Sequence, residues 1–282
     1  MTLTENQPNR DQSSGDRSGT ADNTSGSPGR GGGSKTRSAA IAAVTLAVLL
    51  VAIGAWYFLI REVAPAEVDS VEAAAARSEA AAEADAGAAS SLDGIDGTWA
   101  VDTSIGRFGE ECLTGVCSST FAGFRIDEVL SGIGDKTVVG RTPGVAGRII
   151  IDGTVVGGGE FVVDMTGLIT DSGARTGALR SQAIETEAFP TAGFRLTSPV
   201  DLGRVPADGE QVSLTVAGEL TVHGVTQAVE IPLTAELQNG VIVVFGQLEL
   251  ALSDYDIDAP SAPIVVSVED TAVLELQLFL TR

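Results

Sequence analysis

From about Gly97 to the C-terminus, apolar and polar side chains alternate with a period of two residues. Two clear examples are Val212–Val216 and Leu274–Leu278. Because successive side chains of a β-strand point to opposite faces, such a run indicates a strand with one apolar face. Turn signals separate the runs, and Asn239-Gly240 is a strong hairpin signal. The pattern predicts an all-β domain over residues 97–282, built as a sandwich or an up-and-down barrel.

One segment of this domain has helical rather than alternating character. Gly177–Phe189 contains several helix-forming residues and stops at Pro190, a residue that does not continue a helix. We expect a short helix or helical turn there, packed near the mouth of a barrel.

An uncharged stretch, Ala39–Ile60, precedes the alternating region. Its length suits a helix that crosses a bilayer, so we expect a single transmembrane helix. Arg30, Lys35 and Arg37 lie just before it, whereas mostly acidic residues follow it. The positive-inside rule then places the N-terminus in the cytoplasm and the C-terminal domain on the extracytoplasmic side of the cell membrane. A cleaved signal peptide is the main alternative, although the run is longer than a typical signal-peptide core.

The segments on either side of the uncharged stretch are low in sequence complexity. Residues 1–38 are rich in Ser, Gly, Asn, Asp and Thr, and so polar a segment is expected to be disordered. Residues 61–96 are rich in Ala and Glu, which favour helix. Because this segment has no apolar stripe, we expect an acidic stalk, partly helical, that packs against nothing.

The charge and the scarce residue types exclude several classes of function. The net charge is −21, which argues against nucleic acid as a partner, because neutralising phosphates requires clustered Lys and Arg. The chain contains one histidine, His223, so a multi-histidine metal site is excluded. No nucleophile–base pair is suggested by the sequence. We therefore predict a protein that is not an enzyme and that uses no metal or cofactor.

The two cysteines of the chain, Cys112 and Cys117, are separated by four residues. On the extracytoplasmic side, such a pair is expected to form a disulfide. A metal site would need two further ligands at suitable spacing, and none is adjacent. We therefore predict a disulfide whose effect on stability is modest, since it closes a small loop.

Four sequence motifs resemble those of YceI-like domains. Gly218–Pro232, with its run Leu-Thr-Val-His-Gly-Val-Thr, closely resembles the family signature G-x-L-T-(I/V)-x-G-V-T-x-x-V. Thr98–Asp102 looks like the opening W-x-(I/V)-D, and Gly177–Phe194 looks like the family's L-R-S … (F/Y)-P-x-x-x-F segment. Asp254-Tyr255 matches a late aspartate–aromatic step before the last strand. The resemblance covers Gly97–Arg282, the whole predicted β domain.

The resemblance implies a lipocalin-like antiparallel β-barrel with a long apolar tunnel that binds polyisoprenoid or other amphiphilic lipids. Alternation alone predicts an apolar inward face but does not distinguish a tunnel from a filled core. A solid barrel that acts as a protein-interaction module of the cell envelope is therefore the alternative. The inward residues expected to line the tunnel are Phe124, Ile126, Phe161, Val163, Phe194, Leu196, Leu214, Val216, Ile231, Leu276 and Leu278.

Three polar residues are candidates for contact with a lipid head group. Arg175 and Arg180 lie near the expected helix, where a guanidinium could pair with a pyrophosphate or carboxylate. Ordinary surface ion pairs are the alternative. His223 is expected at a tight turn between two strands, where its ring contacts either a head group or nearby backbone. YceI-like domains usually carry an Arg-Asp pair and a His before the Leu-Arg, and Arg175–Ala178 departs from that pattern.

The uncharged stretch and the β domain together suggest one function. We expect a membrane-anchored extracytoplasmic protein, held by Ala39–Ile60, that binds a polyisoprenoid or similar amphiphilic lipid without catalysis. The tether would keep the mouth of the barrel close to a source of lipid.

Overall fold

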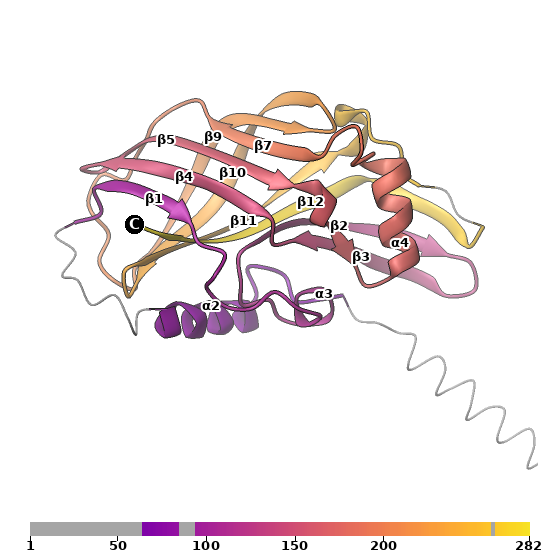
Figure 1. Cartoon of the computed structure of the whole chain (residues 1–282), viewed down its shortest axis with the longest axis horizontal. Helices are drawn as coiled ribbons and strands as arrows, with labels where there is room; N and C mark the ends of the chain where they lie inside the picture. Colours follow the sequence, from indigo (N-terminus) through magenta and orange to yellow (C-terminus); the bar gives the residue numbers. More distant parts are fainter. Residues whose placement is uncertain (1–63, 85–93, 261–262) are drawn as a thin grey trace, which may run out of the picture. The chain divides into compact units, whose positions relative to one another are not determined.

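The alternating sequence forms an antiparallel sheet that closes into a barrel (Figure 1). The computed structural model describes residues 64–84, 94–260 and 263–282. Within them, eight strands pair in a ring, which closes where Val101 of the first strand lies opposite Leu280 of the last. The predicted all-β barrel is therefore confirmed. In ring order the strands are β1 (Gly97–Val101), β4 (Val145–Asp152), β5 (Val155–Asp164), β7 (Thr191–Leu196), β9 (Gln211–Val222), β10 (Val225–Gln238), β11 (Val241–Ala251) and β12 (Val265–Thr281).

Strand β12 is long and pairs with two neighbours along the same edge. Its last residues pair with β1, whereas its earlier part pairs with β2 (Phe121–Leu130). Strand β2 pairs in turn with β3 (Gly134–Thr142), and β3 pairs with the short β6 (Ile169–Thr170). A further short strand, β8 (Val200–Asp201), pairs with the start of β5. The barrel wall is thus extended at one end by β2, β3 and β6.

Two tight hairpins depend on residues that adopt positive φ. Asn239 and Gly240 join β10 to β11 with φ of 51° and 81°. His223 and Gly224 join β9 to β10 with φ of 51° and 76°. Positive φ at both central residues is typical of a type I′ turn, whose twist matches that of the flanking strands. Both turns expected from the sequence are therefore present.

The first described segment packs against the outside of the barrel. Helix α2 (Val71–Ala84) lies along the wall beside β10 and β11 (Figure 1). Its alanines favour helix, and Ala80 and Ala81 are buried in a cluster with barrel residues such as Phe279. The expectation of a stalk that packs against nothing is therefore wrong for residues 64–84. Small alanine side chains let the helix approach the wall closely, so no stripe of large apolar residues is needed.

A helical segment crosses one end of the barrel, near β2 and β3 (Figure 1). It consists of α4 (Gly173–Ala178) and a following π-helical turn, η3 (Leu179–Ala183). The Ser172 hydroxyl accepts a hydrogen bond from the Arg175 N–H and so caps the first turn. The helix expected over residues 177–189 is present near a barrel end, but it begins and ends earlier than predicted.

The two cysteines lie in the segment between β1 and β2. The short helix α3 (Glu111–Thr114) contains Cys112, which forms a disulfide with Cys117. Both residues are buried, so the predicted disulfide is confirmed and belongs to the interior of this segment. Two further single turns, η2 (Met165–Gly167) and η4 (Leu252–Tyr255), follow β5 and β11.

The predicted transmembrane helix, Ala39–Ile60, lies outside the described residues, as do residues 1–38. Among the residues that are described, no helix has the length and apolar character needed to span a bilayer. The expected topology of the N-terminal part therefore stays a prediction.

Candidate ligand-binding cavity

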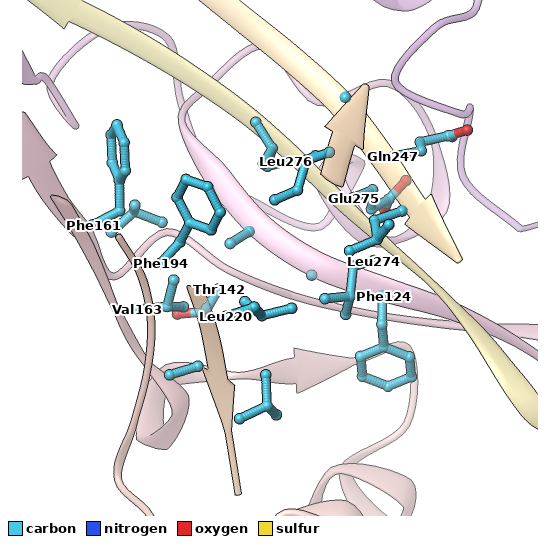
Figure 2. Close-up of a pocket in the computed structure, with 18 of the residues that line it drawn as sticks. Phe124, Thr142, Phe161, Val163, Phe194, Leu220, Gln247, Leu274, Glu275 and Leu276 are labelled. Atoms are coloured by element: carbon cyan, nitrogen blue, oxygen red, sulfur yellow. The ribbon is translucent and has the colours of Figure 1, made fainter. Parts of the chain in front are cut away.

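The barrel encloses a cavity of about 570 Å³ (Figure 2). Most of the side chains that line it are aliphatic or aromatic. Phe161 and Phe194 lie on one side of the space, and Leu274 and Leu276 lie across from them (Figure 2). The barrel is therefore hollow, and the alternative of a solid core is wrong for this domain.

All eleven residues predicted to point inward line this cavity. The period-two pattern explains the agreement, since alternate side chains of one strand face the same side of the sheet. Phe161, for example, lies directly opposite Phe194 on the neighbouring strand. The eleven residues are Phe124, Ile126, Phe161, Val163, Phe194, Leu196, Leu214, Val216, Ile231, Leu276 and Leu278.

Two of the lining phenylalanine rings lie over glycines of a neighbouring strand. A Cβ placed on Gly140 would lie 2.4 Å from Phe124 Cε1, and a Cβ placed on Gly218 would lie 2.2 Å from Phe194 Cζ. Both distances are far below the roughly 3.5–4.0 Å at which carbon atoms make favourable contact. The rings therefore occupy space that any other residue would fill, and they lie close against the barrel wall.

Of the described residues, five charged ones contribute to the cavity wall, and one of the five is a cation. That cation, Arg175 of α4, donates from Nη2 to Glu128 Oε1 at 2.9 Å, and its Nη1 contacts Asp171. The guanidinium is thus already paired with two carboxylates at the α4 end of the cavity. The four acidic residues of the wall are Glu128, Glu210, Glu236 and Glu275.

A model of the YceI-like domain family matches residues 99–280. The chain belongs to the YceI-like domain family. The resemblance seen in the sequence motifs is thereby confirmed over nearly all of the β domain. No protein of curated function matches the chain.

Similar solved structures include three bacterial proteins of low identity to this YceI-like chain. A polyisoprenoid binding domain from Saccharophagus degradans, implicated in plant cell wall breakdown, is 20% identical, with 66% of this chain and 99% of that chain covered and a TM-score of 0.49. BcnA from Burkholderia cenocepacia is 15% identical, with 56% of this chain and 95% of that chain covered and a TM-score of 0.44. The YCEI protein of Campylobacter jejuni is 13% identical, with 50% of this chain and 82% of that chain covered and a TM-score of 0.41. The family assignment itself rests on the match over residues 99–280.

The three residues of this YceI-like domain that were candidates for head-group contact differ in their position relative to the cavity. Arg175 lines the cavity, whereas Arg180 and His223 do not. Arg180 Nε donates to the Leu168 carbonyl oxygen at 3.0 Å. His223 sits in the turn between β9 and β10, with Nδ1 3.2 Å from the Tyr255 carbonyl oxygen. Neither Arg180 nor His223 therefore lines the cavity, and the His223 ring contacts the Tyr255 backbone through Nδ1 and the Glu185 carboxylate through Nε2, at 3.1 Å.

A buried ion-pair cluster of the YceI-like barrel centres on Glu275, one of the acidic residues of the cavity wall. Glu275 Oε2 accepts from Arg125 Nε at 2.9 Å, and Glu275 Oε1 accepts from Arg141 Nε at 2.6 Å. The Glu275 side chain is 0% exposed and that of Arg141 is 1% exposed. Arg141 Nη1 also donates to the Cys112 carbonyl oxygen at 2.7 Å, and Arg125 Nη2 donates to the Ala66 carbonyl oxygen at 2.8 Å. The cluster therefore joins the barrel to the disulfide segment and to the segment before α2.

A further buried cation, Arg77, fixes α2 to the barrel. Its Nη1 contacts the Val68 carbonyl oxygen and lies 3.3 Å from Gln277 Oε1, and its guanidinium carbon lies 3.7 Å from the centre of the Phe245 ring. Burial lowers the pKa of Arg77 to about 10, so the side chain is still charged at neutral pH. Sequence reasoning missed this contact, although a lone arginine in an otherwise acidic alanine-rich helix is the signal that could have indicated it.

Proposed function

We propose that the chain binds one long-chain, isoprenoid-like lipid inside the barrel and holds it without chemical change. The hollow, mostly apolar interior of the YceI-like barrel is the observation that carries the proposal. Transfer of an apolar chain from water into such a cavity is favourable by roughly 25 cal/mol for each Å² of apolar surface removed from water. His223, the single histidine, lies off the cavity wall, which supports a binding role rather than a catalytic one.

We infer that the polar end of this lipid is neutral. Arg175 is the one cation of the described cavity wall, and Glu128 and Asp171 already pair with it. A phosphate or carboxylate head would have to displace one of these carboxylates and would then lie beside a buried negative charge, which is costly. A hydroxyl or carbonyl head can accept a hydrogen bond without displacing either carboxylate. The pairing with pyrophosphate considered from the sequence is therefore disfavoured.

We further propose that Ala39–Ile60 tethers the barrel to the cell membrane on its extracytoplasmic side. The uncharged stretch and its flanking charges support this topology. The disulfide between Cys112 and Cys117 supports it as well, since disulfides persist in oxidising compartments. Protease added to intact cells whose outer face is accessible should digest the C-terminal domain and spare an N-terminal epitope tag. Protection of the C-terminal domain in such cells would contradict the proposed topology.

Mass spectrometry of the full-length chain tests lipid binding directly. Native spectra should show one added mass, and organic extraction should release a neutral, isoprenoid-like lipid. Added geranylgeraniol should also be taken up by protein that has been stripped of lipid. A chain that copurifies with no lipid and takes up no geranylgeraniol would overturn the proposed function.

Two neighbouring residues of β5 provide a matched pair of variants. Phe161 lines the cavity, whereas Val162 faces outward and is 45% exposed. We expect Phe161→Arg to abolish lipid uptake and Val162→Arg to leave it intact, because a guanidinium is excluded from an apolar lumen but tolerated on the surface. Thermal unfolding of both variants monitors the fold. Val163→Phe, which fills part of the cavity without adding charge, should reduce uptake even if Phe161→Arg unfolds the barrel.

A further inference from the structure

Three of the phenylalanine rings that line the cavity each lie against a glycine of a neighbouring strand. We call these three glycines, Gly140, Gly147 and Gly218, the glycine seats. On β3, a Cβ at Gly140 would meet Cε1, Cζ and Cδ1 of Phe124 at 2.4, 2.9 and 3.3 Å. On β4, a Cβ at Gly147 would lie 2.5 Å from Phe161 Cδ1. Gly140 and Gly147 are the direct cross-strand partners of the phenylalanines that cover them. Each ring therefore lies on the backbone of the next strand.

The third seat is on β9, where a Cβ at Gly218 would meet the Phe194 ring at 2.2 and 2.3 Å. A ring that occupies the space left by a missing Cβ takes less of the lumen than a ring that projects from the wall. Phe194 and the two phenylalanines of the other seats all line the cavity. The absence of a Cβ at three wall positions thus widens the space beside three of its bulkiest side chains.

We propose that these three glycine seats set the bore of the cavity and let it admit a methyl-branched chain in preference to an unbranched one. The proposal rests on the proposed lipid binding and adds to it the residues that determine specificity. An isoprenoid chain carries a methyl branch on every unit, so it is wider than an unbranched chain of equal carbon number. The bore, rather than any polar contact, then selects the branched ligand.

Gly140 offers the cleanest test of this role. The three atoms nearest to its virtual Cβ all belong to the Phe124 ring, whereas Gly218 also approaches the backbone oxygen of Arg195 at 2.7 Å. Alanine at position 140 therefore displaces a ring without forcing the strands apart. Leu274 is the cross-strand partner of Phe124 on its other side, so the direction left open to the displaced ring is the lumen.

The experiment compares the affinities of two alcohols for the full-length chain. Geranylgeraniol is the branched probe, and an unbranched unsaturated alcohol of the same carbon number is the control ligand. We expect Gly140→Ala to weaken geranylgeraniol binding about tenfold or more, the lower end of what one methylene in a hydrophobic pocket contributes to discrimination. Binding of the unbranched alcohol should change little. The double variant Gly140→Ala/Phe124→Leu should restore geranylgeraniol binding, because the smaller side chain vacates the lumen.

Gly157→Ala is the matched control variant, since a Cβ at Gly157 on β5 would meet no atom within 4 Å. It should bind both alcohols as the unmodified chain does. An equal loss for both alcohols in Gly140→Ala, or no loss for either, would overturn the bore proposal while leaving lipid binding itself supported. If Gly140→Ala does not fold, the single variant Phe124→Leu provides the test. Its smaller side chain should preserve or increase the preference for the branched alcohol, and a fall in that preference would contradict the proposal. If the unmodified chain binds neither alcohol, the proposed function itself is refuted.

Discussion

Replacement of Glu275 by glutamine tests how the barrel holds the segment that precedes α2. The carboxylate is fully buried and pairs with two guanidinium groups, those of Arg125 at 2.9 Å and Arg141 at 2.6 Å. Glutamine has nearly the same shape but no charge, so both cations would remain buried without a counter-charge. Breaking a buried ion pair from one side typically costs about 3–5 kcal/mol. We expect Glu275→Gln to lower the free energy of unfolding by about 3 kcal/mol or more.

Glu219→Gln is the control for this substitution. Glu219 pairs with Arg195 at 2.6 Å, a distance equal to the shorter of the Glu275 pairs, but the two side chains are 42% and 64% exposed. An exposed ion pair contributes about 0–1 kcal/mol, because water and salt screen it. Urea unfolding of both full-length variants, followed by circular dichroism, measures the difference.

A loss below about 1 kcal/mol in Glu275→Gln, no larger than that of the control, would refute the reasoning from burial. A triple variant offers an independent check, in which Arg125, Arg141 and Glu275 are all replaced by methionine. Removing an entire buried ion cluster is often neutral or even stabilising. The triple variant should therefore recover part of the loss, but not all of it, since the arginines also donate to the backbone oxygens of Ala66 and Cys112.

Three smaller predictions concern other buried or strained positions. Tyr255→Phe should leave the free energy of unfolding unchanged or raise it by about 1 kcal/mol, because the buried Tyr255 hydroxyl has no hydrogen-bond partner among the described residues. Burial raises the pKa of that hydroxyl. The stability that its neutral form confers should therefore be lost as the pH rises through the raised pKa. Unfolding curves of Tyr255→Phe measured at alkaline pH should lack this loss. Replacing Cys112 and Cys117 by serine should lower the free energy of unfolding by about 2 kcal/mol, measured in urea. Gly224→Ala should destabilise the protein by more than about 1 kcal/mol in thermal unfolding, because φ is +76° there and Phe189 lies 2.7 Å from the added Cβ.

The barrel and its inward face could be predicted from the sequence because one local rule decides them. In Leu274–Leu278 the odd residues differ from the even ones in polarity, and that alone assigns Leu276 and Leu278 to the lumen. The turn at Asn239-Gly240 is equally local, since two residues with positive φ suffice. Whether the lumen is hollow depends instead on side chains from all eight strands, and no single run of sequence contains that information.

The polar parts of the structure depend on contacts between distant residues and could not be predicted. Glu275 reads in sequence as the outward member of an alternating strand, yet its partners Arg125 and Arg141 lie 150 and 134 residues away. Arg175 and Arg180 look equivalent in sequence, but the capped helix turns Arg175 toward Glu128 and Asp171 at the cavity wall. Local patterns thus specify which face a side chain takes, whereas its partner is decided by the tertiary fold.

The pairing of β1 with the end of β12 has a consequence for how the molecule folds. The ring closes through Ala100 with Thr281 and Val101 with Leu280, the first and last strands of the barrel. Contacts so distant in sequence form slowly, because a long loop must be ordered first. During synthesis the sheet must remain open, with the edge of β1 against β12 unpaired, until residues 280–281 have emerged. Between translation and closure, the apolar interior is therefore exposed along this edge to a ligand, a chaperone or another open chain.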